Sequence, residues 1–418
     1  MKKILFISVR DPFSERYSGD VIRSKKFVQY LLKKNHVEVI CLGSNNNVTT
    51  SKRLTVRSFK KDNLLQSVIN IFTSLFKFRP LHFSFFHSAE IKEFINDNYQ
   101  NFDVIFCQSI RSFQFLSDKI YKKIILDMGD LYSKNYYQTF RELPFFNPLK
   151  IIYFIESIFV KKFENYCLKT ADTTFLFSKR EIGFLKNIEK NKIIQINFGI
   201  DKIKNLYKYN KNNFKIIFIG NIKYTPNRQA CLNFIKQIFP KLKSKFSNIE
   251  FHVFGEIRDI DKNFFMRAEG VKFYGKIKNL EPYLSKVICG LANLNISTGI
   301  QTKLLTYMSY GIPSISSKQV IENFDKISSN KMIYYTSNSD LINLIIKLKE
   351  NKSFSNQSSK RSLSAIKNFK WEKVLKVFDK FIYTLLFPPA TEAFHASDKT
   401  HSLVFIMHLA HDNHLRPS

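Results

Sequence analysis

Residues 297–317, STGIQTKLLTYMSYGIPSISS, combine several features of an anion-binding site. Gly299 allows the backbone to pass close to a ligand, and the residues after it open a predicted helix whose first N–H groups have no partner within the helix. Those N–H groups belong to Ile300, Gln301 and Thr302. The positive end of the helix dipole and Lys303 both favour negative charge at this place. An ordinary strand–helix connection with a surface lysine is an equally good interpretation of the pattern alone.

Three side chains in the first half of the chain are further candidates for chemistry. Asp130 follows the apolar run KKIILDM, so it should lie at the end of a buried strand, where a carboxylate can act as a general base toward a hydroxyl group. An Asp that caps the following turn is about as good an interpretation. We expect Asp127 to be structural. Arg23, one turn into the first helix, could contact a phosphate or an acceptor, although a lone arginine is more often solvated.

Apolar runs alternate with helical patterns along the chain, and these elements must position the candidates. KILFISV, a loop through Gly19, a helix and VEVICL form a strand–helix–strand unit, and later runs such as DVIFCQS and TTFLFS would extend a parallel sheet. The pattern restarts at FKIIFIG. Ligands bind at the carboxyl ends of the strands in such sheets, so the loops after FIG and before TKLL matter most. The sequence predicts an α/β protein of two doubly wound, Rossmann-like domains that face each other across a cleft.

Shifts in composition suggest the domain boundaries. The polar stretch DKIKNLYKYNKNN separates the two patterns, and the last stretch contains five of the nine histidines of the chain but very few lysines. His408, His411 and His414 have a spacing that could chelate a metal, but they lack an acid or cysteine framework, so we expect no metal site. A non-native or frayed extension is the better interpretation. The predicted parts are residues 1–207 and 208–370, a helix at 371–386 that crosses back to the first domain, and an atypical tail at 387–418.

The charge of the chain is extreme but undirected. Its 418 residues carry a formal net charge of +32, and the lysines are scattered rather than gathered in one arm. An AT-rich codon bias and an attraction to anionic partners explain this equally well. No basic helix interleaved with stacking aromatics occurs, so we expect no nucleic-acid partner. Five dispersed cysteines without a C-x-x-C pair, and no apolar run of membrane-spanning length, favour a cytoplasmic protein whose thiols are reduced and buried.

Residues 1–385 resemble the GT-B glycosyltransferases of family four through motifs that keep the same order. Residues 292–317 resemble the donor-binding helix of that family, whose common form is G-I-Q-N-K-x-L-E-x-M-x-x-G-x-P-V. The matching residues are Gly299, Ile300, Gln301, Lys303, Leu305, Met308, Gly311 and Pro313. SGDVIRS resembles the glycine loop G-D-x-I-R-S, and ILDMGDLYSKNY resembles the segment D-x-x-D-x-x-S. FENYCLKTADTTFLFSKREIGFL resembles E-x(7)-D…S-x-x-E, and FIGNIKYTPN resembles F-x-G-x-M-x-Y-x-P-N. FKWEKVLKVFDKF resembles the C-terminal helix.

The resemblance implies a nucleotide-sugar donor on the second domain and a saccharide or lipid-linked acceptor on the first. It also implies transfer that retains configuration without a metal or another cofactor, so amides and cations must neutralise the leaving diphosphate. Asp130 would then orient sugar hydroxyls. The implied diphosphate-binding residues are Gly220, Gly299, Ile300, Gln301, Thr302 and Lys303. The implied nucleobase site is Gly275, Lys276 and Ile277, and the implied acceptor-side residues are Gly19, Asp20 and Arg23.

The departure from the family pattern is Thr306. A glutamate that binds the ribose hydroxyls usually stands there, eight residues after a second acid, and both positions are threonines here, Thr298 and Thr306. A hydrogen bond to a charged group is worth about 1.5–3 kcal/mol, so nucleotide affinity would fall by roughly ten- to a hundred-fold unless the hydroxyl recovers part of it. The alternative function is therefore a non-catalytic glycosyltransferase-like binding protein. A nucleotide-sugar epimerase of the same fold would need more acids and histidines at the cleft.

The preferred interpretation is a hexosyl-type transferase that builds bacterial surface polysaccharide or glycolipid. In NLLQSVINIFTSLFKFRPLHFSFFHS an apolar helical stripe ends at Lys77 and Arg79. The stripe consists of Leu65, Val68, Phe72, Leu75 and Phe76. Such a stripe more often faces the core, while contact with a membrane that carries a lipid acceptor is the alternative. The expected location is the cytoplasm, with the inner face of the membrane as the site of such contact.

Overall fold

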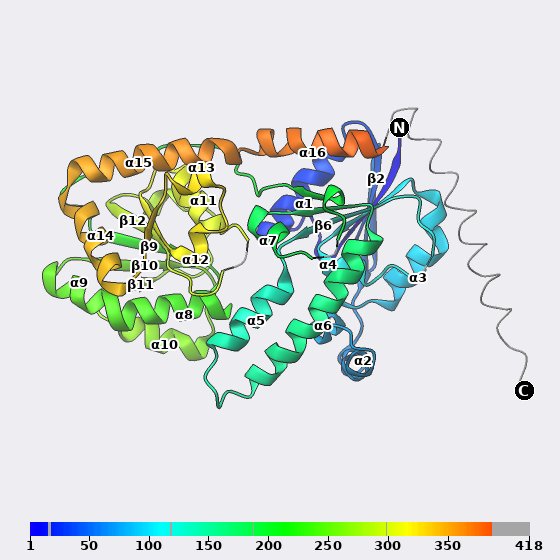
Figure 1. Ribbon diagram of the computed structural model, residues 1–418, viewed down its shortest axis with the longest axis horizontal. Helices are drawn as coiled ribbons and strands as arrows, with labels where there is room; N and C mark the ends of the chain where they lie inside the picture. The colour runs from blue at the N-terminus through cyan, green and yellow to red at the C-terminus, as the bar shows by residue number, and fades with distance from the viewer. Residues whose placement is uncertain (16–17, 118, 187, 298, 387–418) are drawn as a thin grey trace, which may run out of the picture. The chain divides into compact units, whose positions relative to one another are not determined.

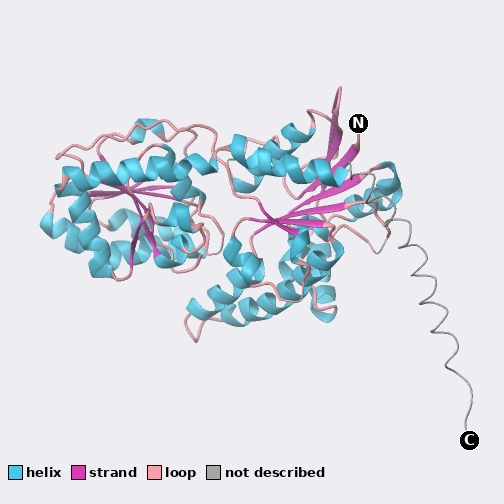
Figure 2. Cartoon of the chain, turned by 45° about the horizontal axis from the view of Figure 1, so that its top comes forward, coloured by secondary structure: helices cyan, strands magenta, loops and turns pink. Residues whose placement is uncertain are grey.

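The computed structural model describes residues 1–15, 18–117, 119–186, 188–297 and 299–386. The chain divides into two compact units, residues 1–374 and 375–418. The first unit holds two sheets, and Figure 2 shows helices on both sides of each. The sequence-based prediction of an α/β fold with doubly wound sheets is confirmed. Both sheets lie in one compact unit, so the predicted boundary near residue 208 separates two parts of that unit.

The first sheet has eight strands in the order β3-β4-β2-β1-β5-β6-β7-β8, parallel except for the edge strand β3, which pairs antiparallel with β4. Figure 1 labels two of its strands, β2 and β6. Its strands are β1 (Lys3–Ser8), β2 (His36–Gly43), β3 (Asn47–Ser51), β4 (Leu54–Lys60), β5 (Val104–Gln108), β6 (Ile124–Gly129), β7 (Thr173–Leu176) and β8 (Ile193–Gln195). Its helices are α1 (Gly19–Leu31), α2 (Leu64–Phe76), α3 (Ala89–Asn98), α4 (Ile110–Phe113), α5 (Tyr132–Glu142), α6 (Leu149–Thr170) and α7 (Lys179–Gly183).

The second sheet has six parallel strands in the order β11-β10-β9-β12-β13-β14. They are β9 (Lys215–Ile219), β10 (Glu250–Phe254), β11 (Val271–Phe273), β12 (Val287–Ala292), β13 (Ser314–Ser317) and β14 (Ile333–Tyr335). The helices are α8 (Thr225–Asn233), α9 (Phe239–Lys245), α10 (Asp259–Arg267), α11 (Thr302–Ser309), α12 (Lys318–Ile321), α13 (Lys326–Ser329), α14 (Asn338–Glu350) and α15 (Lys352–Ile366). Helix α16 (Trp371–Leu386) begins in the first compact unit and continues into the second.

Continuous apolarity of the central strands explains how the sheets form. In β1 the residues from Ile4 to Ser8 are all buried, because helices cover both faces of a parallel sheet. One buried cluster joins β1, β5 and β6 to α3, α4 and α6. The run MKKILFIS is therefore a first strand, as expected. Both sheets reverse strand order beside their first strand, between β1 and β5 and between β9 and β12. Loops at the carboxyl ends near such reversals are where ligands bind in this fold.

Helix α2 departs from the preferred sequence interpretation. Its stripe was expected to face the core, but Leu65 is 72% exposed and Phe76 is 80% exposed. The other three members of the stripe, Val68, Phe72 and Leu75, are exposed as well. Asn63 caps the helix by accepting from the N–H of Gln66, so the helix itself is well formed. The core interpretation is wrong, because the described part of the chain leaves this face of the helix exposed.

Candidate functional site

The loop after β6 is anchored by a buried ion pair. Asp127, near the end of β6, accepts hydrogen bonds from Nε and Nη2 of Arg23 at 2.7 and 2.8 Å, and both side chains are 1% exposed. Nη1 of Arg23 donates to the carbonyl of Asn197, and its guanidinium lies over the rings of Phe27 and Phe177. The prediction that Arg23 contacts an acceptor or a phosphate is wrong, because its charged group is fully enclosed. Asp127 is structural, as expected: the pair fixes helix α1 to strand β6.

Two further buried carboxyls hold the same loop from the other side. Glu181 accepts a hydrogen bond from the N–H of Leu131 at 2.7 Å. Glu164 accepts from the N–H of Ser133 at 3.0 Å and from its hydroxyl at 2.5 Å. Burial raises the pKa of Glu164 to about 7, against the opposing hydrogen bonds from Ser133. Three stretches that resemble separate family motifs therefore converge on residues 130–133, where they fix the backbone.

Asp130 lies at the start of the loop that these side chains hold. Its Oδ1 is shielded from solvent, and no described residue donates a hydrogen bond to it. Burial raises the pKa of Asp130 to about 7; the charge of Arg23 opposes this rise and that of Asp127 adds to it. The neighbouring Glu181 has its pKa raised by burial and by the charge of Asp130. Asp130 does not cap the turn that follows, so the alternative interpretation of this residue is wrong.

Gly299 meets Asp130 directly. Its φ is +64°, and a Cβ at this position would lie 1.6 Å from Oδ1 of Asp130, so only glycine permits the approach. Among the described residues, no acceptor faces the backbone N–H groups from Ile300 to Lys303. Gln301 precedes α11 without capping it, because its side chain donates to Ser297 instead. The predicted row of free N–H donors is therefore present, and it directly follows Gly299, which lies against Oδ1 of Asp130. The neighbouring Thr298 lies outside the described residues.

Lys303 does not project from this loop. Its side chain is buried, Nζ donates to Oδ1 of Asn227 at 2.6 Å, and it lies 4.2 Å from the ring centre of Phe218. Burial lowers the pKa of Lys303 to about 7, and the charge interaction with Cys231 opposes this decrease. The surface-lysine interpretation is wrong, since α11 turns this side chain toward α8, and the predicted part of Lys303 in binding a diphosphate stays a prediction. Asn227, the last residue of the stretch FIGNIKYTPN, was not selected from the sequence.

Gly220 serves Asn227 as well. A Cβ on Gly220 would lie 2.9 Å from Nδ2 of Asn227, and the N–H of Gly220 donates to the carbonyl of Phe254. Gly220 was predicted to let backbone approach phosphates. The close approach in this structure is instead to the side-chain amide of Asn227, which accepts from Lys303, and the predicted approach to phosphates stays a prediction.

Thr306, the position of the missing glutamate, bonds within its own helix. Its hydroxyl donates to the carbonyl of Thr302 at 3.0 Å. The methyl group of Thr302 would lie 3.8 Å from a Cβ on Gly19, so the start of α1 and the start of α11 are neighbours. Asp20, next to Gly19, pairs with Arg10 at 2.5 Å. Of the predicted acceptor-side residues, Gly19 therefore lies beside the donor-side loop.

The predicted nucleobase site is a bare turn. Gly275 has a φ of +67°, and nothing lies within 4 Å of the place where a Cβ would stand. Its carbonyl accepts from the N–H of Gly255 at 2.7 Å. Lys276 is exposed and Ile277 is half-buried. The turn offers backbone and open space, as a site that holds a base against backbone requires, and its occupancy stays a prediction.

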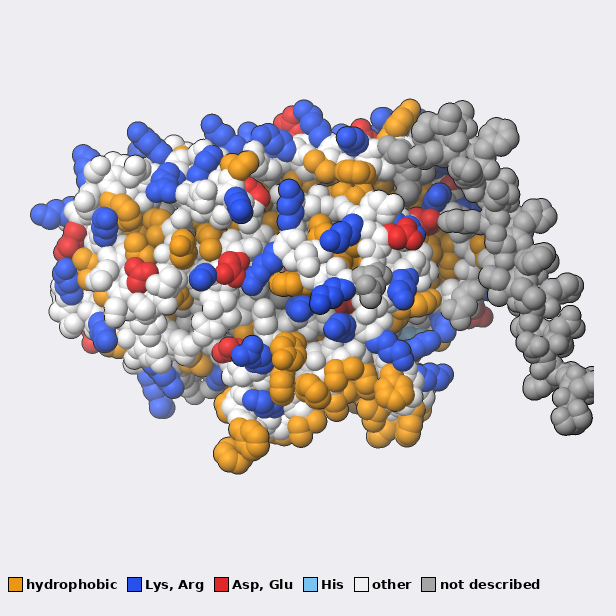
Figure 3. All heavy atoms as spheres, viewed as in Figure 1, with side chains coloured by type: hydrophobic (Ala, Val, Ile, Leu, Met, Phe, Trp, Pro, Cys, Tyr) orange, Lys and Arg blue, Asp and Glu red, His pale blue; other side chains and the backbone are white. Residues whose placement is uncertain are grey.

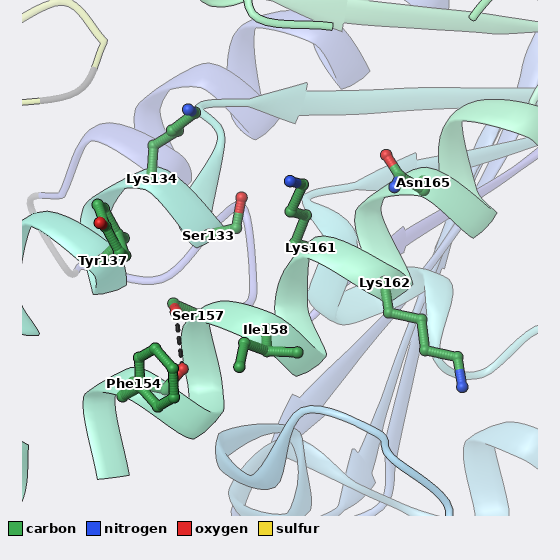
Figure 4. A pocket seen from close by; sticks show the side chains of 9 residues that line it. All are labelled: Ser133, Lys134, Tyr137, Phe154, Ser157, Ile158, Lys161, Lys162 and Asn165. Carbon is green, nitrogen blue, oxygen red and sulfur yellow. Dashed lines mark hydrogen bonds between the residues drawn. The ribbon is translucent and has the colours of Figure 1, made fainter. Parts of the chain in front are cut away.

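A hollow that sequence reasoning missed lies between α5 and α6 (Figure 4). Its volume is about 550 Å³. It is lined by Ser133, Lys134, Tyr137, Phe154, Ser157, Ile158, Lys161, Lys162 and Asn165. The pair Lys161-Lys162 was visible in the sequence, but only the packing of α5 on α6 brings Lys134 to it.

Other expectations concern metals, thiols and membrane spans. Across the described ranges, no group of three or more potential metal ligands occurs, and the histidines of the tail lie outside those ranges. All five cysteines are buried and free, as expected. In the part of the chain that the structure describes, no helix has the length and apolarity needed to cross a bilayer.

Comparisons with known proteins agree with this architecture. Residues 213–351 match the family model described as glycosyl transferases group 1. No curated protein matches the chain in sequence. The fold is similar to that of a sucrose-phosphate synthase from Thermosynechococcus elongatus, with 14% identity, 92% of this chain and 99% of that one covered, and a TM-score of 0.67. It is also similar to WaaG, a glycosyltransferase involved in lipopolysaccharide biosynthesis (10% identity, 92% and 100%, TM-score 0.64). Anabaena HepE in complex with UDP-glucose is a third such structure (13%, 92% and 100%, 0.60).

Proposed function

We propose, from the premise that this chain is a glycosyltransferase of the GT-B fold with a group 1 domain at residues 213–351, a specific reaction for it. It transfers a hexose from a nucleotide sugar to a saccharide or lipid-linked acceptor in the synthesis of a bacterial surface polysaccharide or glycolipid. HepE has been solved with UDP-glucose, which supports a nucleotide-sugar donor here. The observation that carries the proposal is the placement of Asp130 against Gly299, at the start of a row of free N–H donors.

The proposed course of the reaction combines that juxtaposition with what the family resemblance implies. The donor diphosphate accepts hydrogen bonds from the N–H groups of residues 300–303, which offset its growing charge as the bond to the sugar breaks. The acceptor oxygen bonds to the anomeric carbon on the same face, and its proton passes to the leaving diphosphate, so configuration is retained. Asp130 accepts a hydrogen bond from a hydroxyl of the transferred sugar. Because the amides supply the electrostatic stabilisation, turnover proceeds without a bound metal.

Peripheral membrane contact belongs to the same proposal. The exposed stripe of α2 ends close to Lys77 and Arg79, and such a face inserts into the headgroup region of an anionic bilayer. Vesicles of phosphatidylcholine and phosphatidylglycerol should sediment the protein. The double variant Phe72→Ser, Phe76→Ser should stay in the supernatant with unchanged circular dichroism. Equal sedimentation of both proteins would contradict this contact.

The test of the reaction is a donor screen. UDP-, GDP-, CMP- and dTDP-sugars should be compared by thermal shift and by release of the nucleotide (UDP, GDP, CMP or dTDP), each with and without EDTA. One donor should raise the melting temperature and turn over in EDTA, and Asp130→Asn should abolish turnover while it keeps the shift. A screen in which no nucleotide sugar binds or turns over would refute the proposal.

The second candidate is a non-catalytic binding protein of the same fold. It is favoured by Thr306, whose hydroxyl is already bonded to the carbonyl of Thr302. Thr306→Glu should enlarge the thermal shift by the matching nucleotide, since a carboxylate can accept from the ribose hydroxyls. If the native chain binds a nucleotide sugar without turnover, and Thr306→Glu creates turnover, the binding protein is the correct alternative.

A further inference from the structure

Polar and apolar side chains lie at different ends of the hollow between α5 and α6. In Figure 4, Lys134, Lys161 and Asn165 point to one side, whereas Phe154 and Ile158 lie at the other end. Ser133 lies on the polar side. A ligand that fills such a hollow carries a polar head at one end and an apolar body at the other.

The polar end carries positive charge that the protein leaves unbalanced. Among the described residues, no carboxylate lies within ion-pair distance of Lys134, Lys161 or Lys162. The charge of Lys134 does act on Glu164, but both oxygens of Glu164 accept from Ser133, and burial raises its pKa to about 7. The ammonium of Lys134 lies 4.6 Å from the ring centre of Phe184 and that of Lys162 lies over Phe78, so of the three only Lys161 has its ammonium off the aromatic rings of the described residues. An ammonium beside Asn165 and Ser133 suits a phosphate group, which accepts several hydrogen bonds at once, including charge-assisted ones.

The apolar end opens onto a larger apolar surface. On the preceding loop Phe145 is 82% exposed and Phe146 is 93% exposed, and Ile151, Phe154 and Ile158 of α6 are exposed too. Hydrophobic side chains gather along the lower edge of the molecule in Figure 3, where Figure 1 places α6 and α2. This surface extends far beyond the scattered apolar side chains of an ordinary protein face.

Helix α2 joins this surface to the wall of the hollow. The ring of Phe78, just after α2, packs on Phe159 of α6 with ring centres 5.6 Å apart. The ammonium of Lys162, which points away from Lys161 in Figure 4, lies 5.2 Å from the centre of the Phe78 ring. Charge therefore stands at the border between the hollow and the apolar surface, as it does between the headgroups and chains of a bilayer.

We propose that this hollow, the α5–α6 pocket, binds the phosphate-bearing head of an anionic lipid whose hydrocarbon lies along Phe154, Ile158 and the exposed part of α6. The inference rests on the proposed function in one respect: it makes this lipid the anchor of the acceptor. Ser133 lines the pocket only three residues after Asp130, and three residues of extended chain span at most about 10 Å. A sugar or hydroxyl attached to the bound phosphate would therefore lie within reach of Asp130.

Binding of a monomeric amphiphile tests the pocket without a donor. Dodecyl phosphate, below its micelle concentration, should be titrated calorimetrically beside inorganic phosphate and dodecyl maltoside. We expect dodecyl phosphate to bind more tightly than either. Lys161→Ala should weaken it about tenfold, the value of one charge-assisted bond at a partly open site. Ile158→Ser should weaken dodecyl phosphate but leave inorganic phosphate unchanged.

The matched control is Lys169→Ala, which removes an exposed lysine of the same helix outside the pocket. It should leave the affinity for dodecyl phosphate unchanged. Equal loss in Lys161→Ala and Lys169→Ala would show attraction to the overall charge and overturn the pocket. Equal affinity for dodecyl phosphate and inorganic phosphate would show that the hydrocarbon does not contribute to binding, and would refute the proposal of a lipid ligand. Nucleotide-sugar binding and turnover report on the proposed function separately, so either idea can fail while the other stands.

Discussion

Replacing Asp130 by asparagine should stabilise the protein at neutral and alkaline pH while it removes activity. Burial raises the pKa of Asp130 from 3.8 to about 7. Between those values the folded protein retains a proton that the unfolded chain releases, so stability falls as the pH rises through this window. Three pH units correspond to about 4 kcal/mol, an upper figure that is fully expressed above about pH 7. Asparagine carries no charge and escapes this cost.

Urea denaturation at several pH values measures the effect. The difference in unfolding free energy between Asp130→Asn and the native chain should be near zero at about pH 4 and grow to a few kcal/mol at about pH 8. Turnover should be lost at every pH. The combination identifies a carboxylate that is held at a cost to stability because the reaction needs it.

Asp127→Asn is the matched control, three residues earlier and also buried. It breaks a paired carboxylate and leaves Arg23 buried without its partner, so it should destabilise the protein by about 3–5 kcal/mol. The reasoning would be refuted if Asp130→Asn also destabilised the protein at about pH 8, because its carboxylate would then have a stabilising partner.

Two further substitutions test the donor side. Gly299→Ala should abolish turnover and should lower the free energy of unfolding more than Gly275→Ala, because Gly275 has a similar positive φ but lies in open space. The extra loss of stability in Gly299→Ala should shrink when Asp130 is also changed to glycine. Equal losses of stability in the two glycine variants would contradict the contact between Gly299 and Asp130. Lys303→Met should flatten the pH dependence of stability between about pH 7 and 10. Because the pKa of Lys303 is lowered to about 7 in the folded chain, the unfolded native chain binds a proton in this range that the folded chain lacks. The stability of the native chain therefore rises with pH in that window. An unchanged slope in urea denaturation at those pH values would show that Lys303 is charged in the fold.

The sequence predicted the elements that periodicity and glycine determine. The strands are unbroken apolar runs buried on both faces, and Gly299 lies at positive φ beside free amides, as its place before α11 indicated. The resemblance to the segment D-x-x-D-x-x-S, together with the preceding apolar run, also pointed to Asp130 as a candidate. These features are local, because they depend on a few residues of adjacent chain and on whether a segment is covered by helices.

The errors concern where long side chains point. Arg23 was expected at a ligand or in solvent, and Lys303 at a phosphate or on the surface. Each side chain instead extends inward to a partner distant in sequence, Asp127 and Asn227 respectively. The residues near Arg23 and Lys303 in the sequence do not indicate these distant partners. The stripe on α2 failed for a related reason: periodicity shows that a helix has an apolar face, but it does not show what covers that face.

The short segment from Asp130 to Ser133 connects the donor loop with the α5–α6 pocket. Asp130 lies against Gly299, and Ser133 both lines the pocket and bonds to Glu164, whose pKa of about 7 is raised by burial. Glu164→Gln removes one acceptor oxygen and leaves Ser133 less constrained. If the segment sets the distance between the two sites, this variant should keep nucleotide affinity and dodecyl phosphate affinity but lose turnover by about tenfold or more, as small misplacements of reacting groups do. A variant with unchanged turnover would show that the two sites are positioned independently of Ser133.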